Sequence, residues 1–328
     1  MDSAVRRSTP SLFVPLPAQR AHSGNPILHR AGTSNASDDW TLSELPDSEA
    51  VGLFGPSQQF TAYLERLRHE LQSMRIRPKR VTYPSHTQPW NAVTQIDARA
   101  LELADLLAEF DVRCDFTCRE SLSEDMVAQL ALRRRHIRVV VPVISADPTI
   151  QKALEPHSAP LDERLLTAAR LADKEVPVQI VVAPILPNLT DTRESFELLM
   201  SKVAKYGFTN ISAGYLFLRP GQKHMYQSVL SPHGWAEEVL AEFGQPKVLQ
   251  DAGGVSATYL SKARRQRGYA LLITIAAEFG IDVKLSRTAN PDFDRSVPTG
   301  AAESARFQAF MRGVLHRRHK SSLEPAAN

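Results

Sequence analysis

The side chains best suited to chemistry in this sequence lie in short polar segments, each of which follows an apolar stretch. They are His86, Gln88, Thr117, Arg119, Ser145, Asp147 and Arg219. If the apolar stretches are parallel strands, their ends are where ligands bind in α/β barrels. These segments are therefore the first place to expect a ligand.

Each of these residues also has a purely structural interpretation. His86 can be a packed, hydrogen-bonded loop histidine, and Arg219 can pair with a loop carboxylate. Asp147 can cap the turn before a helix, and Asp191 with Thr190 can cap the next helix. The residue types alone leave both interpretations open.

The chain contains two cysteines, Cys114 and Cys118. Their spacing places them on the same side of a strand, where two thiolates would supply half of a metal site. They are the candidate metal ligands of the sequence. Without a third cysteine, we expect them to behave as buried small hydrophobic residues. So few cysteines indicate a reducing, cytoplasmic compartment rather than a secreted disulfide scaffold.

Composition and charge exclude several classes of protein. The net charge of +3 is too small to imply nucleic-acid binding by itself. Two basic clusters, Arg264 with Arg265 and Arg267, and residues 316–320, are expected to be solvated; nucleic-acid contact is the less favoured alternative. No apolar segment is long enough to cross a membrane, so no membrane partner is expected. A Gly-rich phosphate loop, a Gly-x-Ser-x-Gly elbow and a His-Glu-x-x-His motif are absent from the sequence.

The elements that must position these residues alternate along the chain. Helices are predicted at 58–74, 97–110, 123–135, 161–174 and 192–206, and strands at 79–83, 112–117, 137–144, 177–183 and 210–218. Such βα repetition favours a parallel sheet with helices outside, in a barrel or open barrel. A flat doubly wound sheet is the alternative that periodicity does not exclude.

Four regions are expected along the chain. Residues 1–50 are rich in Ser, Pro, Ala and Asn and are predicted to form a disordered arm. A (β/α) partial barrel is expected at 51–232, a helical C-terminal extension at 233–298, and a tail at 299–328. In the extension, helices are predicted at 234–243 and 256–279, the second one broken at Gly268, with a short strand at 282–285.

The polar segments, taken in order, resemble those of the spore-photoproduct-lyase-like branch of the radical-SAM enzymes. The closest match is Pro-Val-Gln-Ile-Val-Val-Ala-Pro-Ile-Leu-Pro-Asn-Leu-Thr-Asp, from Pro177 to Asp191. Further matches are residues 82–91, 117–119, Val143 to Asp147, Leu154-Glu155-Pro156 with Arg164, 218–220 and 265–270. The resemblance covers roughly residues 51–298.

This resemblance implies an α/β fold, a partial (β/α) barrel of the radical-SAM type. It implies S-adenosylmethionine bound beside a [4Fe-4S] cluster. The cofactor-binding residues that it implies are Ser145, Asp147, Ala183, Pro184 and Ile185. The substrate-pocket residues that it implies are His86, Gln88, Thr117, Arg119 and Arg219.

The sequence departs from the family at the residues that the cluster needs. The Cys-x3-Cys-x2-Cys motif is absent, and Ser85, Asn91 and Arg119 replace the family's Asp, Glu and Ser. We therefore expect a degenerate barrel without cluster-dependent cleavage that acts as a ligand-binding or partner protein. One alternative is an active enzyme with atypical cluster ligands, such as Cys114 and Cys118. The other is a nucleotide or nucleic-acid binding module; the partner itself stays unknown.

Overall fold

The computed structural model of this chain describes residues 28–30, 39–42, 57–83, 96–244, 247–250 and 256–293. His86 and Gln88 lie outside these residues, as do the basic cluster at 316–320 and the expected tail at 299–328. No helix in the described part is both long and apolar enough to span a bilayer.

One large sheet has the strand order β1-β2-β3-β4-β5-β6-β7-β11. Its strands are β1 Leu28–Arg30, β2 Asp39–Leu42, β3 Arg80–Tyr83, β4 Arg113–Thr117, β5 Ile137–Val143, β6 Val178–Ile185, β7 Asn210–Tyr215 and β11 Asp282–Leu285. β1 runs antiparallel to β2, and every pairing from β2 to β11 is parallel. Within the described ranges no pairing joins β1 to β11. The predicted partial (β/α) barrel is therefore confirmed, in an open form.

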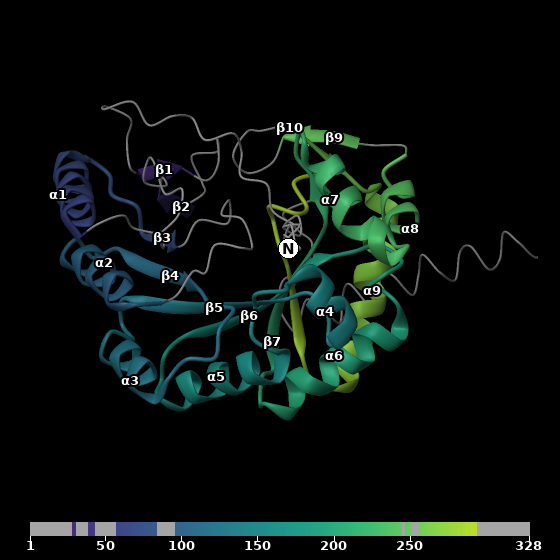
Figure 1. The fold of residues 1–328 in the computed structure, drawn as a ribbon, viewed down its shortest axis with the longest axis horizontal. Helices are drawn as coiled ribbons and strands as arrows, with labels where there is room; N and C mark the ends of the chain where they lie inside the picture. Colours follow the sequence, from purple (N-terminus) through teal and green to yellow (C-terminus); the bar gives the residue numbers. More distant parts are fainter. Residues whose placement is uncertain are drawn as a thin grey trace, which may run out of the picture.

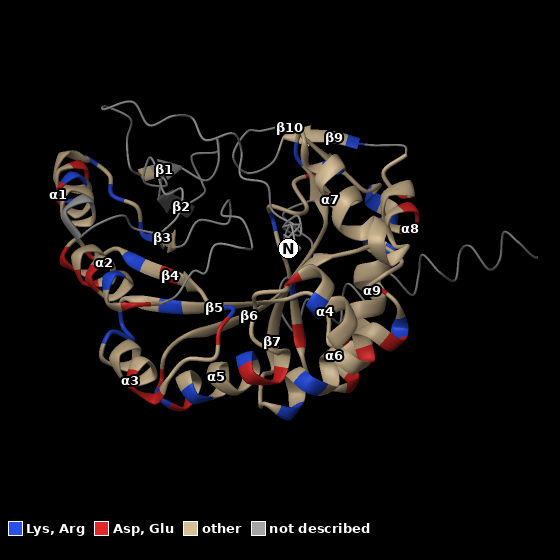
Figure 2. Ribbon diagram, viewed as in Figure 1, with Lys and Arg blue, Asp and Glu red and all other residues tan. Residues whose placement is uncertain are grey.

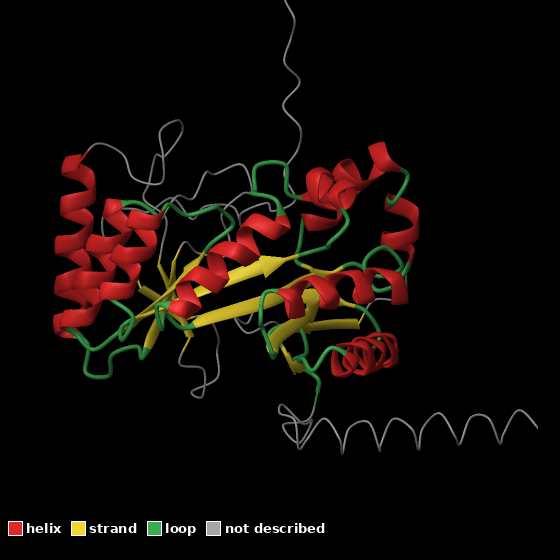
Figure 3. Ribbon diagram, turned by 90° about the horizontal axis from the view of Figure 1, so that it is seen from below, coloured by secondary structure: helices red, strands yellow, loops and turns green. Residues whose placement is uncertain are grey.

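Helices cover the outer side of this curved sheet (Figure 1). They are α1 Ser57–Ser73, α2 Ala98–Glu109, α3 Glu124–Leu132, α5 Leu161–Asp173, α6 Arg193–Lys205 and α9 Lys262–Glu278. Figure 3 shows the helices flanking the layer of strands. Neighbouring helices pack in pairs, α1 with α2, α3 with α5 and α6 with α9. The core lies between these helices and the apolar strands, of which β5 is buried at nearly every position.

Most helices of the barrel begin and end where local sequence signals place them. The Asp97 carboxylate accepts hydrogen bonds from the backbone N–H groups of Arg99 and Ala100, at 3.0 and 3.1 Å, and so caps α2. Ser123 caps α3 in the same way, through Met126 N–H. Gly207 follows α6 with a φ of +81°, in the left-handed region that favours glycine after a helix.

The strand predicted at 210–218 is in fact divided. β7 ends at Tyr215, the N–H of Leu216 donates to the Ile185 carbonyl at 2.9 Å, and β8 (Phe217–Leu218) turns away. β8 joins a separate antiparallel sheet in the order β8-β10-β9. The prediction failed because residues 213–218, Ala-Gly-Tyr-Leu-Phe-Leu, contain no charged residue, so the sequence pattern does not mark where the chain leaves the large sheet.

The C-terminal extension is less helical than predicted. Residues 222–241 form α7 (Gln222–Leu230), a short 3-10 turn and α8 (Ala236–Ala241), after which β9 (Lys247–Gln250) begins. Residues 256–259, predicted as helix, form β10, because Tyr259 and Phe217 pair across the strands with rings stacked 5.0 Å apart. Gly268 does not break α9, and the predicted strand at 282–285 is confirmed as β11.

The expected disordered arm contains two strands. β1 and β2 extend the sheet beyond β3, and the Leu28 N–H donates to the Glu70 carboxylate on α1 at 3.0 Å. Leu28 itself is buried in the core. Each strand is only three or four residues long, which is too short for an alternating pattern to predict it.

Candidate functional site

The candidate site lies at the C-terminal ends of β4, β5 and β6. Because these strands are parallel neighbours, the segments that follow them meet at one edge of the sheet. The register pairs Thr117 with Val140, and Val143 with Val182. Ser145 and Asp147 therefore follow β5 beside the Ala183-Pro184-Ile185 stretch of β6, as the resemblance implies.

Ser145 and Asp147 form a local turn that starts a helix. The Asp147 carboxylate accepts hydrogen bonds from Thr149 N–H at 2.7 Å and Ile150 N–H at 3.4 Å. The Asp147 N–H in turn donates to the Ser145 hydroxyl at 3.0 Å. Asp147 is thus the N-cap of α4 (Pro148–Leu154), which is the structural interpretation weighed above.

A buried charge cluster lies immediately beside this turn. The Arg164 guanidinium donates to both carboxylate oxygens of Glu155, at 3.2 and 2.7 Å, and to the Pro142 carbonyl at 2.9 Å. Arg119 Nε lies 3.5 Å from the same Glu155 carboxylate. The side chains of Arg164 and Glu155 are 0% exposed. Two guanidiniums therefore share one carboxylate, and burial lowers the pKa of Arg119 to about 10.

Two buried polar atoms of this cluster, Thr117 Oγ1 and Arg164 Nε, lack a hydrogen-bond partner among the described residues. Glu120 Oε1 also lacks one, and its carboxyl lies near Ile96 and Asp97. Burial also raises the pKa of Glu120 to about 7, and the nearby Asp97 carboxylate adds to the shift. Native proteins leave few such atoms unpaired, so a cluster of them at strand ends indicates a place for a ligand or an ordered water.

Glu155, Arg164 and Glu120 were not predicted as site residues. Glu155 and Arg164 entered only as parts of the resemblance, without a role of their own. The signal was present in the pattern Leu-Glu-Pro followed by an arginine on the apolar face of α5. A charged residue on such a face must find a buried partner.

A second polar cluster, formed by Asp191, Tyr215 and Arg264, involves the segment that follows β6. A cis peptide joins Ala183 to Pro184, and β6 ends at Ile185. Asp191, which was expected to cap α6, instead accepts hydrogen bonds from the Tyr215 hydroxyl and Arg264, both at 2.7 Å. Thr192 caps α6 through Ser195 N–H at 3.1 Å. The prediction missed by one residue because Thr and Asp are both good caps.

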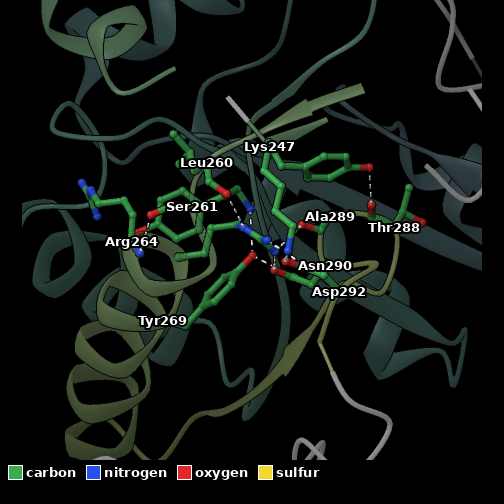
Figure 4. Close-up of polar contacts among 12 residues, drawn as sticks. Lys247, Leu260, Ser261, Arg264, Tyr269, Thr288, Ala289, Asn290 and Asp292 are labelled. Carbon is green, nitrogen blue, oxygen red and sulfur yellow. Dashed lines mark hydrogen bonds and ion pairs between the residues drawn. The ribbon is translucent and has the colours of Figure 1, made fainter. Parts of the chain in front are cut away.

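The basic cluster of α9 is largely occupied inside the protein. Arg265 is fully buried and donates to Asp292, Asn290 and the carbonyls of Leu260 and Ala289, at 2.6 to 3.3 Å. Figure 4 shows Asn290 and Asp292 converging there with Lys247 and Tyr269. Arg264 pairs with Asp191, so only Arg267 of this cluster is exposed.

Arg219 follows a strand of the small sheet, whereas Thr117 and Ser145 lie at the ends of strands of the large sheet. It follows β8 of the small sheet, where its guanidinium lies 5.6 Å from the centre of the Phe217 ring. The contacts described for Arg219 therefore tie it to the small sheet rather than to Arg119 or Ser145.

The cysteines do not fit an iron-sulfur cluster. Both thiols are buried, and burial raises the pKa of Cys118 to about 12 and that of Cys114 well above its usual value. Cluster ligands are thiolates, and three are needed where this chain has two cysteines in all. Within the described part of the chain, no group of three His, Cys, Asp or Glu side chains is arranged to hold a metal ion.

Comparison with known proteins identifies related folds. No family model matches the sequence. Uncharacterized proteins of Mycobacterium bovis and Mycobacterium tuberculosis are 27% identical over 157 residues, which is 47% of this chain and 46% of theirs. The chain thus matches about half the length of these curated relatives.

Solved structures give a broader match. Spore photoproduct lyase complexed with dinucleoside spore photoproduct superposes with a TM-score of 0.53, at 12% identity, over 69% of this chain and 67% of the lyase. A double mutant of that lyase, with AdoMet and dinucleoside spore photoproduct bound, gives 0.51 at 12% identity, over 68% and 66%. The chain has the radical-SAM fold of spore photoproduct lyase.

Proposed function

We propose that this chain is a radical-SAM-fold protein that binds S-adenosylmethionine, or a similar adenosyl ligand, without cleaving it through an iron-sulfur cluster. The observation that carries the proposal is the pairing of two guanidiniums with one carboxylate at the ends of β4 and β5. Beside this pairing, the buried Thr117 hydroxyl and Arg164 Nε have no hydrogen-bond partner among the described residues, and the polar groups of a bound ligand would supply one.

The residues present fit the ligand but not the cluster. Arg119 would hold the carboxylate of the ligand's amino-acid part, and the buried Thr117 hydroxyl would bind one of its polar groups. S-adenosylmethionine carries an activated sulfonium, which is the chemistry that it supplies when bound. Because the two buried thiols cannot replace three cluster thiolates, we derive no radical step for this chain.

Ser145, Asp147 and Glu155 would have a supporting role. Asp147 caps the start of α4, and both carboxylate oxygens of Glu155 accept hydrogen bonds from the Arg164 guanidinium. These contacts keep the polar edge in one geometry before a ligand arrives, which lowers the ordering cost of binding. The lyase with bound AdoMet supports this choice of ligand because it shares the fold.

Iron and sulfide analysis after anaerobic reconstitution, with an assay for 5'-deoxyadenosine, tests the proposal. We expect no stoichiometric iron, no deoxyadenosine and retained S-adenosylmethionine binding. About four iron per chain together with an absorption band near 400 nm would overturn it, because a cluster would then be bound by unexpected ligands.

A further inference from the structure

The opposite edge of the sheet, where the parallel strands begin, carries a band of basic side chains. The band comprises Arg75, Arg77, Lys79, Arg113, Arg134 and Arg135, on the three segments that enter β3, β4 and β5. All six are exposed. Figure 2 shows blue residues along the segment after α1 and at the starts of these strands.

The carboxylates of this edge neutralise only part of the band. Asp105 pairs with Arg133, Glu109 with Arg68 and Glu175 with Arg134. The buried Asp115 is shared by Arg80 and Arg138. Arg75, Arg113 and Arg135 make no ion pair with any described carboxylate. The band therefore keeps a clear positive excess.

Two exposed aliphatic side chains stand within this band. Ile76 is 80% exposed between Arg75 and Arg77, and Leu132 is 75% exposed just before Arg133. They are the most exposed large hydrophobic residues of the described part. Exposed aliphatic side chains cost free energy in water unless a partner covers them. Their position among arginines therefore suits a partner whose surface presents both anionic groups and an apolar layer.

A hollow of about 440 Å³ lies in the same band. Its walls include Arg75, Arg77 and Lys79 with Met74 and Phe110, and the Arg77 guanidinium lies 5.3 Å from the centre of the Phe110 ring. The hollow is open to solvent and combines three cations and the single carboxylate of Asp111 with apolar walls, so its lining keeps a positive excess. Such a hollow suits an anionic head group attached to an apolar body.

We propose that this edge of the barrel docks on an anionic lipid bilayer. The arginines would attract phosphate and carboxylate head groups, and Ile76 and Leu132 would enter the interface between head groups and acyl chains. Such peripheral contact needs no spanning helix. A nucleic acid would match the arginines but not the two aliphatic side chains, and a second copy of this edge would be repelled by its own charge.

This inference is independent of the adenosyl site, which lies at the other end of the strands. Docking through the strand starts would leave the ends of β4, β5 and β6 facing away from the bilayer. Lipid binding and adenosyl-ligand binding can therefore be measured, and can fail, separately.

Cosedimentation of the full chain with vesicles tests the proposal. We expect binding to phosphatidylcholine vesicles that contain phosphatidylserine, none to phosphatidylcholine alone, and loss of binding at high salt. The triple variant Arg75→Gln, Arg113→Gln, Arg135→Gln should weaken binding on the order of 100-fold, at roughly fivefold per arginine. The double variant Ile76→Ser, Leu132→Ser should weaken it about 10-fold or more.

Matched variants elsewhere on the surface serve as controls. Lys152→Gln, Lys223→Gln, Arg267→Gln removes as much charge away from the band, and Leu166→Ser, Leu198→Ser replaces exposed leucines on α5 and α6. Neither should change vesicle binding, and thermal melting should show that every variant folds. Absence of vesicle binding would overturn the proposal. Tight binding of duplex DNA without binding of the vesicles would also overturn it. The same is true if the control variants weaken vesicle binding as much as the band variants do.

Discussion

Two buried arginines of this barrel, Arg265 and Arg164, have very different surroundings. Both side chains are 0% exposed. Arg265 meets one carboxylate, one amide and two carbonyls, and none of its donor atoms is a buried atom left without a partner. Arg164 shares its only carboxylate with Arg119, and its Nε has no partner among the described residues.

The difference separates a structural clamp from a candidate binding site. The Arg265 network ties α9 to the segment after β11, and the Asn290 amide continues it to Tyr269 at 2.9 Å. A fully satisfied network fixes one geometry. The cluster around Arg164 has buried polar atoms without a partner among the described residues, and native proteins keep few such atoms unless a ligand or an ordered water completes them.

Replacing Arg265 should have the largest effect on stability. Arg265→Met leaves Asn290 and Asp292 buried without their main donor, so we expect a loss of about 3–5 kcal/mol in the free energy of unfolding. Urea denaturation measures it. Arg267→Met, at an exposed position of the same helix, should stay within about 0.5 kcal/mol. Similar midpoints for the two variants would contradict the clamp.

Filling Gly268 should have the next largest effect. A Cβ at this position would lie 1.5 Å from the Tyr215 hydroxyl oxygen, so α9 or the ring must move. We expect Gly268→Ala to cost about 1–3 kcal/mol despite the better helix propensity of alanine. Arg267→Ala is the control. An unchanged denaturation midpoint would mean that α9 does not seat closely on Tyr215.

The Glu120 carboxyl should make stability depend on pH. Its pKa is raised from 4.5 to about 7, so the folded protein keeps a proton that the unfolded chain has already released in that window. Stability should therefore fall as pH rises from 4.5 to 7, by on the order of 1 kcal/mol once partial solvent exposure is allowed for. Glu120→Gln should remove this fall. Urea denaturation at several pH values measures the free energy of unfolding of both proteins. The same dependence on pH in the two would refute the assignment.

Replacing Arg119 should affect stability least. Arg119 adds a second positive charge to a buried carboxylate that already pairs with Arg164, so Arg119→Met should change stability by less than about 1 kcal/mol. Urea denaturation of Arg119→Met and Arg265→Met, side by side, measures the two losses in the free energy of unfolding. A loss as large as that of Arg265→Met would place both arginines in the same structural class.

The sequence predicted the barrel well and the site only in outline. Alternating apolar segments and caps such as Asp97 and Ser123 are local signals, and they located the helices and strands from α1 to α6 closely, apart from the short α4. The division between β7 and β8, and the strand at 256–259, depend on pairing between distant segments. The charge cluster could not be predicted for the same reason: Glu155 and Arg164 come into contact only in the folded chain, where the segment after α4 meets α5.

Calorimetric titration of the iron-free chain with S-adenosylmethionine, with Arg119→Met in parallel, tests the central claim most directly. The account predicts one site per chain and an affinity at least about 10-fold weaker in the variant, since a charge-assisted hydrogen bond contributes about 1.5–3 kcal/mol. Absence of binding to the folded chain, or equal affinity in the variant, would contradict it.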